Sequence, residues 1–178
     1  MFAAAPGPAR VWRTVGEDAN RELIERFYEA FGRCDGVAMS ACYAPGAHFR
    51  DPAFGDLEGE EIGAMWRMLT GRATDLKIEL HEHEANGDSG SAHWIARYTF
   101  STGRPVVNDI QARFRFADGL IADHVDEFDF RRWAGQALGP MGHLVAILPP
   151  LRSKARAKAR GQLDEFIAAE RGGPSAQE

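Results

Sequence analysis

Residues 121–133, IADHVDEFDFRRW, decide the fold predicted for this chain. The stretch follows an Asp118-Gly119 turn, so we expect it to be the second arm of a β-hairpin. Residues two apart on a strand share a face, which puts His124, Asp126 and Phe128 on one side. The other side carries several acids, which suit solvent better. We therefore predict that the imidazole and the carboxylate lie together in an apolar interior, where such a pair can do proton chemistry or hold a polar ligand.

The residues before this stretch change from a helical to a strand pattern. Helical spacing follows a capping-box pair, Thr14 and Glu17, and ends near residue 32. We then expect a second short helix from Val37 to near Pro45-Gly46, a short strand at 48–51, a loop at 51–55 and a third helix from about Gly59. After the third helix, apolar and polar residues alternate with a period of two, which predicts a four-strand meander up to residue 128. Helices followed by a meander indicate the α+β class, with a curved antiparallel sheet, three N-terminal helices and a C-terminal helical extension.

Composition sets limits on function. The chain of 178 residues is long enough for one domain with a sizeable core, and its 44% hydrophobic and 26% charged content is ordinary for a globular protein. A net charge of -5 argues against a general nucleic-acid binder. Cys34 and Cys42 form no metal-binding pattern and are expected to be reduced. With no signal-peptide pattern at the start, we expect a cytoplasmic protein.

The segment after residue 136 is predicted to cross near the pocket mouth and then to pack on the domain. Residues 137–151 are apolar but broken by glycine and proline, so they cannot form one regular helix, and we expect them to cross near the pocket mouth. A basic helical segment follows, with Arg and Lys between residues 152 and 160. It could meet an anionic membrane, but its apolar stripe is narrow, which favours a surface helix packed on the domain from about Leu151. We therefore expect no stable membrane association.

The order of elements resembles the nuclear-transport-factor-2-like superfamily, which includes ketosteroid isomerases, limonene epoxide hydrolases and SnoaL-like polyketide cyclases. The matching residues are Phe27 to Phe31, Tyr43 to Pro52, Leu57 to Gly59, and the meander that closes with His124 and Asp126. The resemblance implies a cone, in which a curved sheet wraps the helices and leaves a pocket in its mouth, and frequent dimers through the outer sheet face. The expected organisation is a flexible arm at 1–15, a SnoaL-like cone domain at 16–135, an apolar linker and basic helix at 136–170, and a disordered tail at 171–178.

The chemistry that the resemblance implies carries over in part. Asp51 matches the general base of ketosteroid isomerases, but the positions of their two oxyanion donors match Phe27 and Ala112, and Tyr28 should point elsewhere on its helix. Asp126, with His124 beside it, matches the acid/base of SnoaL-like cyclases. Counterparts of the groups by which limonene epoxide hydrolases activate water can be suggested only by residue type; they are Arg97, Tyr98 and Asn108.

Each of these residues also has a plain structural explanation. His124 and Asp126 could bond to backbone or to Arg97 or Arg113, and Asp51 could cap a turn. His81 and His83 share a strand face by alternation, but a solvated edge is favoured over a metal site. The aromatic residues that could line a pocket could equally be core. These are Tyr28, Trp66, Trp94, Tyr98 and Phe128.

The favoured function is binding of a small apolar or polycyclic molecule in the cone by a homodimer. Acid/base chemistry of the isomerase, cyclase or epoxide-hydrolase type is expected, with Asp126, His124 and Asp51 as catalytic residues. The substrate-binding set is the five aromatic residues with Asn108. None of these reactions requires a metal or a cofactor. The alternative is a non-catalytic ligand-binding or protein-interaction module of the same fold.

Overall fold

The computed structural model describes residues 15–172, apart from the side chains of Val15 and Glu17. Thr14 of the predicted capping box, most of the predicted arm and residues 173–178 of the predicted tail lie outside the described residues. The helices, in chain order, are α1 (Val15–Gly32), α2 (Gly36–Ser40), α3 (Glu60–Arg72), α4 (Phe130–Leu138), α5 (Pro140–Ile147) and α6 (Pro149–Gly172). The strands are β1 (Tyr43–Asp51), β2 (Gly55–Glu58), β3 (Lys77–Asn86), β4 (Ser89–Thr99), β5 (Pro105–Ala117) and β6 (Leu120–Glu127).

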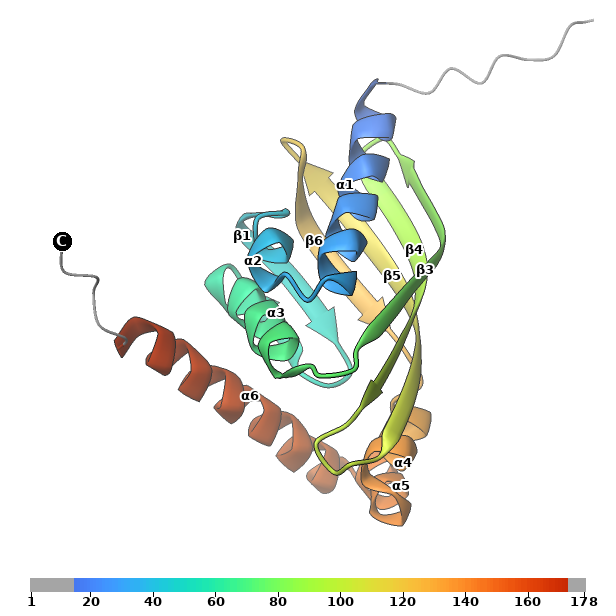
Figure 1. The fold of residues 1–178 in the computed structure, drawn as a ribbon, viewed down its shortest axis with the longest axis vertical. Helices are drawn as coiled ribbons and strands as arrows, with labels where there is room; N and C mark the ends of the chain where they lie inside the picture. Colours follow the sequence, from blue (N-terminus) through green and yellow to red (C-terminus); the bar gives the residue numbers. More distant parts are fainter. Residues whose placement is uncertain (1–14, 173–178) are drawn as a thin grey trace, which may run out of the picture.

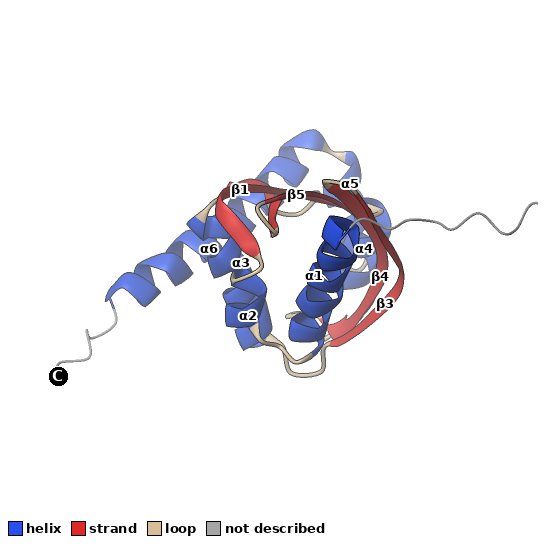
Figure 2. Ribbon diagram, turned by 90° about the horizontal axis from the view of Figure 1, so that it is seen from above, coloured by secondary structure: helices blue, strands red, loops and turns tan. Residues whose placement is uncertain are grey.

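The strands form one six-stranded sheet in the order β2-β1-β6-β5-β4-β3. Its concave side wraps around α1, while α2 and α3 close the remaining side (Figures 1 and 2). This confirms the predicted α+β cone. One pair differs from the expectation, because β1 runs parallel to β6 and the sheet is therefore mixed. All other neighbouring strands are antiparallel.

The region around β1 is where the sequence prediction was wrong. We expected a helix reaching Pro45-Gly46, but α2 ends at Ser40 and the strand already begins at Tyr43. We also expected a loop where β2 begins, but this short strand pairs with β1, with Leu57 opposite Phe49. Both strands depend on hydrogen bonds to distant partners, which local patterns do not reveal.

Helix α1 supplies the centre of the core. Its residues Leu23, Ile24, Phe27 and Phe31 are all buried against the sheet, in agreement with their helical spacing. Close approach requires a glycine in β4. A Cβ added at Gly90 would lie 2.9 Å from the Phe116 ring and 3.1 Å from the end of Ile24. The same Cβ would also lie 2.9 Å from the backbone oxygen of Glu84 in β3, so a larger residue would force the neighbouring strand to shift.

A bulge in β3 corrects the predicted relation between His81 and His83. The register shifts between Leu80 and His83, so the two histidines do not share a face. The ring of His81 stacks on that of His93, with ring centroids 5.2 Å apart. His83 instead lies 2.8 Å from a carboxylate oxygen of Glu25 on α1. An extra residue inserted in one strand reverses the alternation, so spacing alone misplaced the pair.

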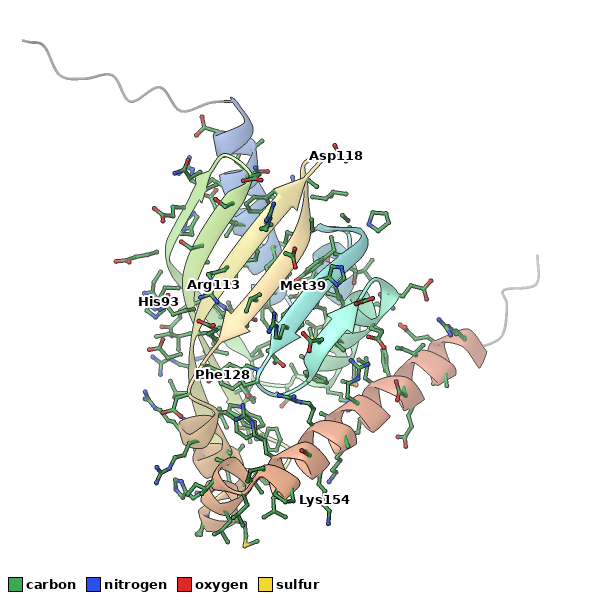
Figure 3. All side chains as sticks on the ribbon, turned by 180° about the vertical axis from the view of Figure 1, so that it is seen from behind. Met39, His93, Arg113, Asp118, Phe128 and Lys154 are labelled. Carbon is green, nitrogen blue, oxygen red and sulfur yellow. The ribbon has the colours of Figure 1, made fainter. Side chains whose placement is uncertain are left out.

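The outer face of the sheet carries charged pairs. Arg113 binds Glu127 through two hydrogen bonds of 2.8 and 2.7 Å, and His93 lies 2.9 Å from Asp109. Arg115 lies 3.6 Å from a carboxylate oxygen of Asp88. Figure 3 shows His93 and Arg113 on this outer side. Such exposed pairs each contribute at most about 1 kcal/mol.

After β6 the chain forms two short helices and then one long one. Gly139, with a φ of 67°, and Pro140 separate α4 from α5. Helix α6 then crosses the end of the cone and packs on α3 (Figure 1). Leu163 is fully buried in this contact, and Arg67 of α3 binds Glu170 through two hydrogen bonds. Over the described part of the chain, none of these helices combines the length and apolar character needed to cross a membrane.

Leu163→Ala should show how strongly α6 is attached. Leu163 is 0% exposed, so its truncation should lower the free energy of unfolding by about 2 to 5 kcal/mol. Leu148→Ala is the matched control. Leu148 is 45% exposed, so its truncation should lower the free energy of unfolding by less than about 0.5 kcal/mol. Urea denaturation of both variants gives the comparison. Equal effects would mean that α6 does not pack on the domain as described.

Candidate active site inside the cone

The inner face of β6 holds the two residues on which the sequence prediction centred. His124 is 0% exposed and Asp126 is 5% exposed, whereas Glu127 of the opposite face is exposed. Across the sheet, His124 is opposite Phe114 and Asp126 is opposite Ala112. The small Ala112 side chain leaves the Asp126 carboxylate without a bulky cross-strand neighbour. Alternation therefore placed both side chains correctly in the interior.

A chain of buried hydrogen bonds leads to Asp126. The indole Nε1 of Trp66 donates to the Tyr43 hydroxyl over 3.1 Å, and this hydroxyl lies 2.6 Å from Nδ1 of His124. Nε2 of His124 lies 3.0 Å from Oδ1 of Asp126. Each proton finds an acceptor when Tyr43 donates to Nδ1 and His124 carries its own proton on Nε2. The chain therefore fixes one tautomer and one ring orientation of His124.

Aromatic rings surround this hydrogen-bonded chain. The His124 ring lies among Phe27, Phe49 and Phe114, at centroid distances of 5.7, 5.1 and 4.4 Å. Water is thus excluded from the imidazole. In such a low-dielectric surround, hydrogen bonds are stronger and unpaired polar groups are more costly. Burial, with the negative charge of Asp126, also holds the pKa of Tyr43 well above its usual range.

Asp51 comes next to Asp126 through the parallel pairing of β1 and β6. Arg50 is in register with Val125, and Asp51 and Asp126 are the next residues on the two strands. Residues in step on neighbouring parallel strands lie on the same face, roughly 5 Å apart. The site therefore contains two neighbouring carboxyl groups at the ends of adjacent strands.

The environment of Asp51 suits a group that exchanges a proton near neutral pH. Burial raises its pKa from 3.8 to about 7, and the charge of Asp126 adds to the rise, against backbone hydrogen bonds that lower it. Oδ1 accepts hydrogen bonds from the backbone N–H groups of Ala53 and Phe54, at 3.0 and 2.6 Å. Asp51 is thus a turn cap, as one interpretation held, and also a neighbour of Asp126.

Tyr28 and Trp94 place two unused donors in the interior. Their ring centroids are 5.5 Å apart, and both side chains are buried. The Tyr28 hydroxyl and the Trp94 indole nitrogen have no hydrogen-bond partner among the described residues. Burial raises the pKa of Tyr28 well above its usual range, and the charge of Asp126 adds to this. Tyr28 points elsewhere on α1 than Phe27, as expected, because its ring lies beside Trp94 whereas that of Phe27 lies beside Trp66 and His124; both side chains are nevertheless buried.

The other predicted binding residues are divided between this interior and its edge. Tyr98 is partly buried, and its hydroxyl accepts a hydrogen bond of 2.8 Å from Trp133 Nε1. Phe128 is partly buried and lies near Trp133, with ring centroids 6.2 Å apart. Asn108 follows the inward alternation of β5 and is partly buried. Arg97 was wrong as a counterpart in the pocket, because it lies on the outer face and binds Glu79 at 2.8 Å.

Sequence reasoning missed the role of Tyr43. This residue appeared only as the start of a matching segment, inside what we expected to be the end of a helix. Its place beside His124 follows from the β1–β6 pairing, in which Tyr43 is in register with Ile121. An inward tyrosine at the start of a strand would have been the only local signal.

Two hollows lie beside α6 in the described part of the chain. Tyr43 lines one of them, and neither is lined by Asp126 or His124. One, of about 530 Å³, lies between the start of β1, α3 and the end of α6. The other, of about 610 Å³, lies along α6 and is lined by Pro149, Arg152, Ser153, Arg156, Ala157 and Arg160.

Comparison with known proteins agrees with this architecture. An LEH-like epoxide hydrolase from M. tuberculosis superposes with a TM-score of 0.60 at 18% identity, covering 75% of this chain and 98% of its own. A protein from Jannaschia sp. CCS1, provisionally named a SnoaL-like polyketide cyclase, gives 0.63 at 17% identity, with coverage of 72% and 98%. TerC, co-crystallised with polyporic acid, gives 0.58 at 17% identity, with coverage of 67% and 98%. At these identities the likeness establishes the fold alone.

The fold and its inward-facing polar residues define a protein of the nuclear-transport-factor-2-like class. Residues 24–124 match the SnoaL-like domain family, and the chain belongs to that family. No curated protein sequence matches the chain significantly.

Asp51→Asn should change how stability depends on pH. Because the folded-state pKa of Asp51 lies above its ordinary value of 3.8, the folded protein binds this proton more tightly than the unfolded chain. The contribution of Asp51 to stability is thus greatest below pH 3.8, falls as pH rises toward about 7, and is constant above it. Across this pH range, the unfolding temperature of the Asn variant should decline less than that of the wild type.

Asp56→Asn is the matched control for this measurement. Asp56 lies in β2 beside the same loop, with its side chain 80% exposed. Its removal should leave the pH dependence of the unfolding temperature unchanged. If Asp51→Asn and Asp56→Asn give the same pH profile, Asp51 is not held in a desolvated environment.

Proposed function

We propose that the cone binds a small apolar or polycyclic molecule and performs cofactor-independent acid/base chemistry on it, of the isomerase, cyclase or epoxide-hydrolase type. The observation that carries this proposal is the buried hydrogen-bonded chain from Trp66 through Tyr43 and His124 to Asp126. It ends on a carboxylate whose other oxygen, Oδ2, has no hydrogen bond among the described residues. Several titratable groups converging in one apolar interior favour an enzyme over a passive core.

In this proposal Asp126 accepts a proton from the substrate, or from water, through its free oxygen. His124 orients the carboxylate through Oδ1, and Tyr43 in turn holds the His124 tautomer. Asp51 is the second carboxyl group. With its pKa raised to about 7, it is partly protonated near neutral pH and can return the proton.

Tyr28 and Trp94 are proposed to donate hydrogen bonds to a substrate oxygen. Their unpaired O–H and N–H groups are the kind of fixed dipoles that stabilise a developing negative charge. Tyr98, Phe128, Asn108 and Trp66 are proposed to contact the apolar body of the ligand. The complex of a protein of the same fold, TerC, with polyporic acid supports a small organic ligand.

A second candidate, a non-catalytic ligand-binding or protein-interaction module, is favoured by a different observation. Each member of the hydrogen-bonded chain has a partner within the protein, and neither hollow described above is lined by His124 or Asp126. In that case His124 and Asp126 would specify the packing of the core. The two candidates differ in whether Asp126 is needed for turnover.

Asp126→Asn tests the catalytic role. The amide keeps the shape and can still accept the hydrogen bond from His124, but it cannot take up a proton. Two probe reactions cover the proposed chemistry: exchange of the α-protons of β-tetralone in heavy water, and hydrolysis of limonene oxide. We expect the wild type to accelerate at least one of them, and the Asn variant to lose about a hundredfold of this rate with nearly unchanged melting temperature.

Asp123→Asn is the control, because Asp123 lies on the opposite face of the same strand. It should keep full activity. Full activity in Asp126→Asn would refute the assignment. Binding of β-tetralone without acceleration of either reaction would support the non-catalytic candidate instead.

We further propose a cytoplasmic homodimer that associates through the outer face of the sheet. Ile95, Val107 and Val125 are partly exposed there, between the charged pairs, and two-fold association of identical faces is the commonest way to cover such a surface. The free thiols of Cys34 and Cys42 support a reducing compartment. Light scattering at micromolar concentration should give the dimer mass, and Ile95→Glu should reduce it to that of a monomer. A wild type that is monomeric at this concentration would contradict the proposal.

A further inference from the structure

Helix α6 presents a row of arginines to the end of the cone. Arg152, Arg156 and Arg160 are four residues apart, so they share one face of the helix. This face is turned toward the domain. The Arg160 guanidinium donates a hydrogen bond of 2.6 Å to the carbonyl of Asp56. The Arg156 side chain packs against Gly55, 3.1 Å from the point where a Cβ added to this glycine would lie.

Two of these three guanidinium groups have no carboxylate partner among residues 15–172. Arg152 lies over the ring of Phe130, 4.9 Å from its centroid. Arg156 makes one long hydrogen bond of 3.4 Å to the carbonyl of Pro52. Elsewhere on α6, the arginines that contact the domain are neutralised, since Arg160 binds Glu61 and Arg171 binds Glu60. Arg152 and Arg156 therefore keep most of their donors free.

The two free guanidinium groups line the hollow of about 610 Å³ along α6. A guanidinium presents several N–H groups in a planar fork that matches the oxygens of a carboxylate or phosphate. An uncompensated pair of such groups beside a concave space has the chemistry of an anion site.

The residues that line this hollow all belong to α6, but two contacts relate its arginines to the edge of the sheet where the carboxyl groups lie. Because β1 and β6 are parallel, they end at the same edge of the sheet, with Asp51 as the last residue of β1 and Asp126 next to the last of β6. Arg156 contacts Pro52, directly after Asp51. Arg152 contacts Phe130, shortly after the end of β6. Both guanidinium groups therefore stand at the edge where the proposed catalytic carboxyl groups lie.

We propose that Arg152 and Arg156 form a subsite for the anionic group of the ligand, so that the molecule taken by the cone is an aromatic or polycyclic acid rather than a neutral compound. The anionic group is held at α6, and the apolar body extends toward Asp51 and Asp126. This inference rests on the proposed binding function.

The test compares two probes that differ in charge, naphthalene carboxylate and naphthalenemethanol. Binding is followed through the indole N–H signals of Trp94 and Trp133 in NMR spectra. The wild type should bind the carboxylate more tightly than the alcohol. The double variant Arg152→Gln/Arg156→Gln should bind the carboxylate about tenfold more weakly, with little change for the alcohol, because only the charged hydrogen bonds are lost.

Lys154→Gln is the matched control, since it removes one positive charge from the same helix. Lys154 is exposed and points away from the domain (Figure 3). It should leave both affinities unchanged. The proposal is overturned if the wild type does not prefer the carboxylate, if neither probe binds, if the arginine variants lose both probes equally, or if Lys154→Gln has the same effect as the double variant.

These outcomes are independent of the catalytic assignment. The Asp126→Asn variant should keep the preference for the carboxylate, because the subsite does not involve Asp126. If the probe reactions fail while this preference depends on Arg152 and Arg156, the acid subsite stands and only the proposed chemistry is lost.

Discussion

The parallel pairing of β1 with β6 is the constraint on which the rest of this structure depends. It adds β1 and β2 to the meander and so closes the cone around α1. It brings Phe49 into register with His124, and it makes Asp51 and Asp126 neighbours. A parallel pair must be joined through a long intervening segment. Here that segment runs from residue 52 to residue 119 and contains β2, α3 and the strands β3 to β5, so the site is assembled only when these elements fold together.

The interior combines close packing with polar groups, and these two features place opposing demands on the protein. Aromatic rings around His124 stabilise the fold by burial, but they also raise the cost of any polar atom left unpaired. For His124 this cost is avoided, because its Nδ1 is hydrogen-bonded to Tyr43, which in turn accepts a hydrogen bond from Trp66. Tyr28 and Trp94 have no such partners among residues 15–172. Unpaired donors in an otherwise satisfied core are costly to retain, and binding a ligand oxygen is a physical reason to retain them.

Proteins of this fold show why the architecture does not specify the reaction. The neighbours reported above share the cone at 17 to 18% identity, yet their names refer to epoxide hydrolysis and to polyketide cyclisation. The cone supplies a dry interior whose lining can be changed without altering the sheet. Chemistry therefore depends on a few inward side chains. The side chains that we propose for this role are two neighbouring carboxyl groups, the imidazole of His124 and the two donors of Tyr28 and Trp94.

The sequence alone determined the α+β class, the meander and the inward direction of His124, Asp126, Trp94 and Tyr98, because alternation along a strand is a local property. It misplaced the start of β1, missed β2, paired His81 with His83 wrongly and placed Arg97 in the pocket. Only the tertiary structure decided that Tyr43 bonds His124, that Asp51 adjoins Asp126 and that α6 brings Arg156 to the carbonyl of Pro52. Each of these contacts joins residues far apart in the chain, through strand pairing or helix docking. Their energies come from partners that no local pattern contains.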